Sequence, residues 1–477
     1  MKKNLIIYLT IFAITLTSCE KLLDKEPTDK LSIADLFKDI SGAKTALAGA
    51  YSGLLSEDYY QKNMMVYPDL LGGNIKYSKT LNTILNDIYD VVQTPIESSM
   101  NATYTNLYQQ LNNVNNVIQY TATAAGSNTE KTKIIAEAKC LRALLHFDLL
   151  RIFAQPFNFT SNANHPGIVI NLKPQLFGDA PPIRSSVAQC YQAIITDLVE
   201  SIANFDNTNT AVLAGGAKQN YFTKASAQAL LAKVYLYQNN WDLAFSTADE
   251  LIKSNQYSLI TNANYVASWT GRTPSSESIF EIALEVNFSS NGLGAYFDIA
   301  NLTYRQYAAT NDILGLYTNT DVRRNTSMFN SVAINSVNFL FTKKYATGGT
   351  SATPIKVLRL SDIYLIRAEA AAEKSNPDFI TANADLNLIR KRADPSASSL
   401  NLTAKTDLIN AILLERRKEF AFEGNLLFDL IRKKQNIVRT DCNAQTCNLN
   451  FGDNRLIMPL PANTIISNNS IFQNPGY

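Results

Sequence analysis

The chain has 477 residues, of which 46% are hydrophobic and 18% are charged, a balance typical of globular proteins. Its 43 basic and 41 acidic side chains give a formal charge of +2, without the basic excess that a nucleic-acid-binding groove needs. Two histidines and five cysteines argue against zinc sites, histidine-based acid–base chemistry and a disulfide scaffold. A length of roughly three average domains leaves the number of domains open.

The N-terminus indicates export. Two lysines precede the apolar run 5–16, which at about 1.5 Å per residue is too short to cross a hydrocarbon core of ~30 Å. This pattern predicts a signal peptide over residues 1–18. The residues before Cys19 resemble a bacterial lipobox, in which the cysteine is acylated and becomes the new N-terminus. The alternative is an ordinary signal peptide followed by a chance cysteine.

Lipidation at Cys19 would make residues 19–40 a membrane tether, because several acyl chains anchor a protein that one chain cannot. Removal of residues 1–18 leaves 41 side chains of each sign, so the mature chain is neutral. No later run approaches the ~18 apolar residues of a membrane span. We therefore expect a neutral protein held at a membrane by its N-terminal lipid.

Helical periodicity dominates the remaining sequence. It is clearest over 134–153, where apolar residues recur at steps of three and four. Within 224–254, the spacing of Leu231, Tyr235 and Ala244 matches a tetratricopeptide unit. Further helices are predicted from residue 41 to about 54, and over 102–120, 362–373, 381–392, 408–422 and 426–433. Because their spacing is irregular, we predict a mainly α fold built from stacked but degenerate helical pairs.

Two long connections, 56–100 and 287–311, interrupt these helices, and connections of this length are more often functional than idle. Alternation of apolar and polar residues over 280–286 predicts a half-buried strand. Other short strands are predicted at 167–172, 338–344, 355–360 and 455–460.

Sequence motifs give little support to catalysis. H-E-x-x-H, G-x-S-x-G and the phosphate-binding G-x-x-x-x-G-K-[ST] do not occur. Carboxylate pairs such as Glu281 with Glu285, or Asp69 with Asp298, could in principle serve a glycosidase, but nothing distinguishes them among 41 acids. We therefore expect no catalytic residues, no metal and no cofactor.

Three smaller features leave alternatives open. Cys442 and Cys447 form either a local disulfide or two free thiols. The run 415–419 interleaves both signs of charge, which favours a salt-bridged helix face over a binding patch. Cys140 and His146 lie in the strongest predicted helix and are interpreted as packing or capping residues, with a role as ligands the alternative.

Many tyrosines lie in the two long connections, among Asn, Asp and Gly. Flat rings beside amides and carboxylates suit a sugar, whose C–H faces stack while its hydroxyls form hydrogen bonds. The alternative is that the tyrosines fasten the connections to the helices. As ligand-binding residues we predict Asp69, Asn74, Tyr77, Tyr296 and Tyr304.

Five blocks of sequence, in order, resemble the SusD/RagB family of outer-membrane nutrient-binding lipoproteins. They comprise Cys19 with Leu-Asp-Lys-Glu-Pro at 23–27, the central helix block 136–149, the hairpin block 229–237, the block 415–430 with Glu-Arg-Arg-Lys-Glu-Phe, and the tail with Pro-Leu-Pro at 459–461 and Gln-Asn-Pro-Gly-Tyr at 473–477. Cys140 and His146 depart from the pattern, since bulky apolar or aromatic residues are commoner there.

The resemblance implies a right-handed superhelical framework of tetratricopeptide-like pairs, with one SusD-like domain over 41–477. It also implies a cell-surface lipoprotein of the outer membrane that binds glycans and delivers them to a SusC-like TonB-dependent transporter without cleaving them. A peptide ligand is the alternative within the same architecture, and a carbohydrate-active enzyme is the less favoured one. The family's ligand residues vary with substrate, so no binding residue is transferred by motif.

Overall fold

The structure is a computed structural model that describes residues 32–78, 85–176, 178–208, 210–213, 215–284, 292–297, 306–345 and 353–477. The predicted signal peptide and Cys19 lie outside these ranges. Within the predicted tether 19–40, residues Ile33–Leu36 form the short helix α2. Among the described helices, none combines the length and apolar character needed to cross a bilayer.

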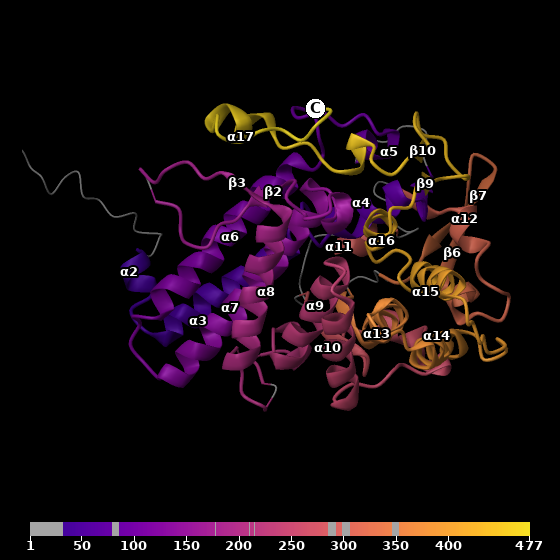
Figure 1. Cartoon of the computed structure of the whole chain (residues 1–477), viewed down its shortest axis with the longest axis horizontal. Helices are drawn as coiled ribbons and strands as arrows, with labels where there is room; N and C mark the ends of the chain where they lie inside the picture. Colours follow the sequence, from indigo (N-terminus) through magenta and orange to yellow (C-terminus); the bar gives the residue numbers. More distant parts are fainter. Residues whose placement is uncertain are drawn as a thin grey trace, which may run out of the picture.

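Antiparallel helices form the frame of the molecule (Figure 1). The longer helices are α3 (Ile40–Ser52), α4 (Asn63–Gly72), α6 (Asn101–Thr121), α7 (Asn128–Phe153), α8 (Val187–Asn204), α9 (Lys224–Tyr237), α10 (Trp241–Lys253), α13 (Leu360–Glu373), α14 (Phe379–Ala393), α15 (Lys405–Glu419) and α16 (Leu426–Arg432). Shorter ones are α5 (Asn86–Asp90), α11 (Gly292–Ala295), α12 (Asn311–Leu314) and α17 (Ala462–Ser467).

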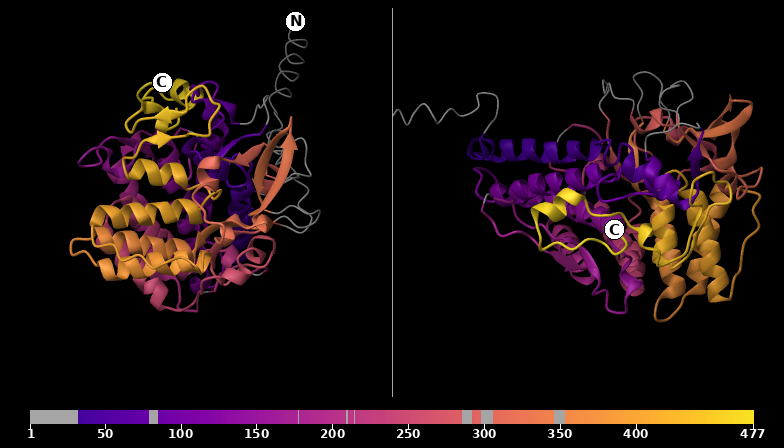
Figure 2. Two further views of the ribbon diagram at one scale, coloured as in Figure 1. Left: turned by 90° about the vertical axis from the view of Figure 1, so that its right-hand side faces the viewer. Right: turned by 90° about the horizontal axis from the view of Figure 1, so that it is seen from above.

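Helices adjacent in the sequence pack as pairs, with α6 on α7, α7 on α8, α9 on α10 and α13 on α14. Figure 2 shows α13, α14 and α15 stacked side by side at the C-terminal end of the frame. This arrangement confirms the predicted mainly helical framework of tetratricopeptide-like pairs.

Local sequence explains where several helices begin and how closely they pack. Ser186 and Gln189 form a capping box at the start of α8, in which each side chain accepts a hydrogen bond from the other residue's backbone N–H. Helix α9 is buried around its whole circumference. Its small residues Ala225, Ala229 and Ala232 leave room for neighbouring helices to approach.

The described strands form two-stranded antiparallel ladders between the helices. They pair β1 (Ile75–Tyr77) with β5 (Tyr307–Ala309), β2 (Pro166–Val169) with β3 (Arg184–Ser186), β4 (Ser278–Ile282) with β8 (Ile355–Arg359), β6 (Phe329–Ile334) with β7 (Val337–Thr342), and β9 (Ile437–Val438) with β10 (Asn448–Leu449). Residues of β4, β5 and β8 are largely buried and contribute to the hydrophobic core.

Two strand predictions were wrong in detail. Every residue of β4 is buried, so the strand is not half-exposed. Glu281, predicted to face solvent, instead forms a buried ion pair of 2.6 Å with Lys356 of β8. The segment 455–460 is not a strand, because a helical turn occupies Asn454–Leu456 and the Met458 N–H then donates to Ile152 O at the end of α7.

The connection 56–100, predicted as a loop, contains α4, β1 and α5. Helix α4 is buried along its whole length, so no apolar stripe opposite a solvent-facing polar side marks it in the sequence. It also contains Pro68, a residue that disfavours a helix interior. No bounds were predicted for helix α8, although its apolar face is regular.

The largest hydrophobic cluster extends from Phe37 before α3 to Ile471 after α17, and two smaller clusters lie among α13, α14 and α15. Cys140 and His146 lie fully buried in α7, as their interpretation as packing residues requires. The His146 Nε2 accepts the Asn171 N–H at 3.2 Å, and burial lowers the histidine pKa to about 3. The assignment of 41–477 to one domain stays a prediction.

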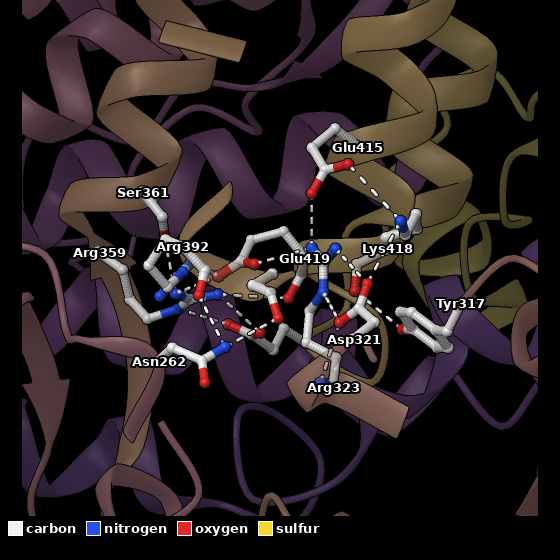
Figure 3. Close-up of polar contacts among 12 residues, drawn as sticks. Asn262, Tyr317, Asp321, Arg323, Arg359, Ser361, Arg392, Glu415, Lys418 and Glu419 are labelled. Carbon is white, nitrogen blue, oxygen red and sulfur yellow. Dashed lines mark hydrogen bonds and ion pairs between the residues drawn. The ribbon is translucent and has the colours of Figure 1, made fainter. Parts of the chain in front are cut away.

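A buried ionic network joins α15 to the elements around it (Figure 3). The Glu419 carboxylate, fully buried, pairs with Arg392 at 2.6 Å, Arg323 at 3.0 Å and Arg359 at 3.1 Å. Arg359 and Arg392 also bind the buried carboxylate of Glu277, at 2.5 Å and 3.2 Å. The run 415–419 is therefore salt-bridged as predicted, but mainly to other elements and within the core.

Candidate functional site

The two long connections meet where β1 pairs with β5. Tyr77 and Tyr307 are direct partners across this ladder, and their rings stack with centroids 5.8 Å apart. Tyr296 lies 6.1 Å from Tyr307, and Tyr89 lies 4.6 Å from Tyr77. We call these four residues the tyrosine cluster. It unites side chains that are more than 200 positions apart in the sequence.

The rings of the tyrosine cluster are largely buried, with exposed fractions of 6% for Tyr77 and 4% for Tyr296. Polar side chains border the cluster beside Tyr296. The Tyr296 hydroxyl donates to Glu57 Oε2 at 3.4 Å, and Lys62 Nζ lies 5.8 Å from the ring centroid. The Glu57 side chain is 54% exposed, so the carboxylate that borders Tyr296 faces solvent.

Asp69 and Asn74 lie next to the cluster, at the end of α4. Gly73 ends this helix in the left-handed conformation, with φ at +100°. The turn brings Asn74 Nδ2 to within 2.6 Å of Asp69 Oδ1. The other carboxylate oxygen of Asp69 accepts the Gly424 N–H at 2.7 Å, and Asn74 Oδ1 accepts Arg417 Nε–H at 3.0 Å.

These bonds connect the α4 turn to the C-terminal helices. Burial raises the pKa of Asp69 to about 6, against the opposing effect of the hydrogen bonds from Asn74 and Gly424. Both oxygens of Asp69 and the amide oxygen of Asn74 are thus engaged inside the protein. Their assignment as ligand-binding residues stays a prediction.

The predicted site residues therefore fall into three groups. Tyr77 and Tyr296 come together through Tyr307, and Asp69 and Asn74 form a buried pair beside them. Tyr304 lies outside the described residues. Sequence reasoning counted Tyr307 among the loop tyrosines but did not select it, although its ring links Tyr77 to Tyr296.

Tyr89 was missed altogether, because only its contact with Tyr77 shows its relation to the cluster. Cys442 and Cys447, on the neighbouring loop, are joined by a disulfide. Within the described ranges, no three His, Cys, Asp or Glu side chains are grouped so that they could hold a metal ion.

Stacked helical pairs with an aromatic cluster on their loops define a tetratricopeptide-like helical protein. Two family models together match nearly the whole chain. The model of the SusD family matches residues 228–477, and the model described as "Starch-binding associating with outer membrane" matches residues 21–236. The chain belongs to the SusD family, also called SusD/RagB.

Relatives and solved structures agree with this membership. A SusD-like protein of Formosa agariphila is 23% identical over 97% of this chain and 96% of its own length. A SusD superfamily protein of Bacteroides vulgatus has a similar structure, with a TM-score of 0.82 and 26% identity over 92% of this chain and all of the other.

A laminarin-binding SusD-like protein shares the fold, with a TM-score of 0.73 and 19% identity over 92% of this chain and all of the other.

Proposed function

We propose that this chain is a cell-surface lipoprotein that binds neutral glycans and delivers them to a TonB-dependent transporter of the outer membrane. The observation that carries the proposal is the convergence of both long connections on the tyrosine cluster, in a chain of the SusD family. One family model describes starch binding at the outer membrane, and one structural neighbour is named for laminarin binding.

We assign ligand recognition to the solvent-facing edge of the tyrosine cluster. Aromatic rings next to hydroxyl, carboxylate and ammonium groups are suited to sugars, since the rings contact C–H faces while polar groups bind hydroxyls. At this edge the Tyr296 hydroxyl, Glu57 and Lys62 lie together. Asp69 and Asn74 hold the adjoining turn in place.

Calorimetric titration with neutral oligosaccharides tests this assignment. We suggest maltoheptaose and laminarihexaose, which represent the two glycans named above. The Tyr296→Phe variant removes only the hydroxyl, and we expect it to weaken binding about tenfold, because a hydrogen bond to a charged or bound polar group contributes about 1.5 kcal/mol. The Tyr364→Phe variant, on the distant helix α13, is the matched control.

The results separate the possible functions. Equal affinity for wild type and Tyr296→Phe would remove Tyr296 from the site. Release of shorter sugars from a bound oligosaccharide would indicate an enzyme instead of a binding protein. If neither glycan binds but peptides co-purify with the native protein, the ligand is a peptide.

The transporter and the lipid anchor are the remaining parts of the proposal. A tagged chain recovered from native outer membranes should bring a TonB-dependent barrel with it in stoichiometric amount. Recovery of the chain alone, after mild detergent extraction that preserves other outer-membrane complexes, would contradict delivery to such a transporter.

A further inference from the structure

The C-terminal segment returns across the N-terminal half of the frame, where α17 lies above α6 (Figure 1). It is attached by backbone hydrogen bonds, from Ala462 N–H to Pro95 O and from Met458 N–H to Ile152 O, each 2.9 Å. A cleft of about 520 Å³ opens between α6, α17 and the segment after β2. We call it the α6–α17 cleft.

The volume of this cleft lies within the range of small-molecule sites, about 300–1,000 Å³. Its chemistry is distinctive: among the described residues that line it, none carries a charged side chain. Instead the lining combines two tyrosines with a series of carboxamides. They are Tyr104, Tyr108, Asn112, Asn171, Gln175 and Asn468.

The aromatic side chains are held firmly. The rings of Tyr104 and Tyr108 lie 4.6 Å apart, and Tyr104 packs edge-on against Phe153 at 5.0 Å. The Tyr108 hydroxyl accepts the Val169 N–H at 3.1 Å and donates to the Val169 carbonyl at 3.0 Å. Because these rings are already fixed, ligand binding would cost little side-chain entropy here.

The carboxamides are oriented too. Asn112 Oδ1 accepts the Gln175 N–H at 2.9 Å, and Gln175 Nε2 donates to Asn171 Oδ1 at 3.2 Å. Within the described part of the chain, Asn112 Nδ2 and Gln175 Oε1 have no hydrogen-bond partner. Gln175 is exposed and Asn112 half-buried, so a donor and an acceptor remain available at the cleft.

We propose that the α6–α17 cleft is a second carbohydrate-binding site, which takes a short segment of a neutral oligosaccharide. A sugar hydroxyl both donates and accepts hydrogen bonds, as the oriented amides of Asn112 and Gln175 require, and fixed tyrosine rings suit its C–H faces. A charged peptide or nucleotide would find no countercharge in this lining. The inference extends the proposed function to a surface separate from the tyrosine cluster.

The test fills the cleft without disturbing the core. Ser467 is an exposed residue at the end of α17 that lines the cleft, and the Ser467→Trp variant places a large side chain there. Asn469 is also exposed but does not line the cleft, so Asn469→Trp is the matched control. Calorimetry with maltoheptaose and laminarihexaose compares both variants with wild type and with Tyr296→Ala.

For a glycan that binds, we expect Ser467→Trp to lower the affinity at one site at least tenfold, while Asn469→Trp matches wild type. A maltotriose or laminaritriose soak should place sugar density against Tyr104 and Tyr108. Binding by Ser467→Trp that equals the Asn469→Trp control would overturn the second site.

Loss of all binding in Tyr296→Ala, with Ser467→Trp unaffected, would leave the proposed function standing and remove only the cleft. Loss of glycan binding in Ser467→Trp but not in Tyr296→Ala would support the α6–α17 cleft as a binding site and contradict the assignment of binding to the tyrosine cluster. Absence of any binding by wild type to both glycans would overturn both assignments.

Discussion

Replacing Glu419 by glutamine removes one negative charge from the centre of the ionic network. Three arginines, Arg323, Arg359 and Arg392, lie within 3.1 Å of its carboxylate. Burial acts to raise the Glu419 pKa, but the three guanidinium groups outweigh this effect and hold the pKa below its ordinary value. In Glu419→Gln the arginines stay buried with less countercharge, and an amide N–H must face a guanidinium group.

Loss of one partner from a buried ion pair costs about 3–5 kcal/mol, because the other charge stays desolvated. The entropy of unfolding is about 2.1 cal/mol/K per residue, or roughly 1 kcal/mol/K for a chain of 477 residues. The melting temperature should therefore fall by about 3–5 °C. Differential scanning calorimetry at neutral pH measures it directly.

The matched control is Glu130→Gln. Glu130 pairs with Lys44 at 2.6 Å, but their side chains are 39% and 32% exposed, and such surface pairs contribute about 0–1 kcal/mol. We expect this control to melt within about 1 °C of wild type. Equal melting temperatures for Glu419→Gln and Glu130→Gln would refute the reasoning that burial makes the ion pairs of the network contribute more to stability than surface pairs do.

Three further changes test other parts of the structure. Burial raises the pKa of Glu137 from 4.5 to about 7, so between these pH values the folded state binds a proton that the unfolded state lacks. The free energy of unfolding should therefore rise by roughly 3 kcal/mol as the pH falls from 7 to about 4.5. Chemical denaturation at several pH values measures this rise, and Glu137→Gln should remove it. Cys19→Ala should shift the chain from the membrane to the soluble fraction of the cell envelope. In Gly424→Ala the added Cβ would lie 2.4 Å from Met64 O at a φ of +70°, so the variant should melt several degrees lower, and an unchanged melting temperature would contradict this close approach.

Periodicity predicted several helices that have one solvent-facing side. Helix α6 is an example, since its buried residues Tyr104, Leu107, Leu111 and Val114 recur at steps of three and four. Helix α4 has no solvent-facing side, so its sequence shows no stripe, and only packing against other elements explains why it is helical. The alternating pattern of β4 was misleading in a similar way. Its polar residue Glu281 is buried in an ion pair with Lys356, so the strand is buried on both faces.

Amino-acid composition predicted the chemistry of a candidate site but not which residues come together in it. An abundance of loop tyrosines indicated aromatic recognition, but the central position of Tyr307 depends on the β1–β5 register, which joins residues more than 200 positions apart. The α6–α17 cleft could not be predicted from the sequence at all. It requires the C-terminal segment to return to α6, and no local pattern in Asn112, Gln175 or Ser467 indicates that contact.

Buried ion pairs hold the C-terminal helices of the frame together. Arg416 pairs with Asp362 and Asp429, and Arg432 pairs with Glu369, all inside the core. These ion pairs join α13, α15 and α16. The proposed binding surfaces consist of side chains at the ends and edges of this frame. Because buried ion pairs stabilise the frame, a change at a binding surface such as Ser467→Trp should alter ligand affinity without lowering the melting temperature. A change inside the network such as Glu419→Gln should instead lower the melting temperature of the whole protein.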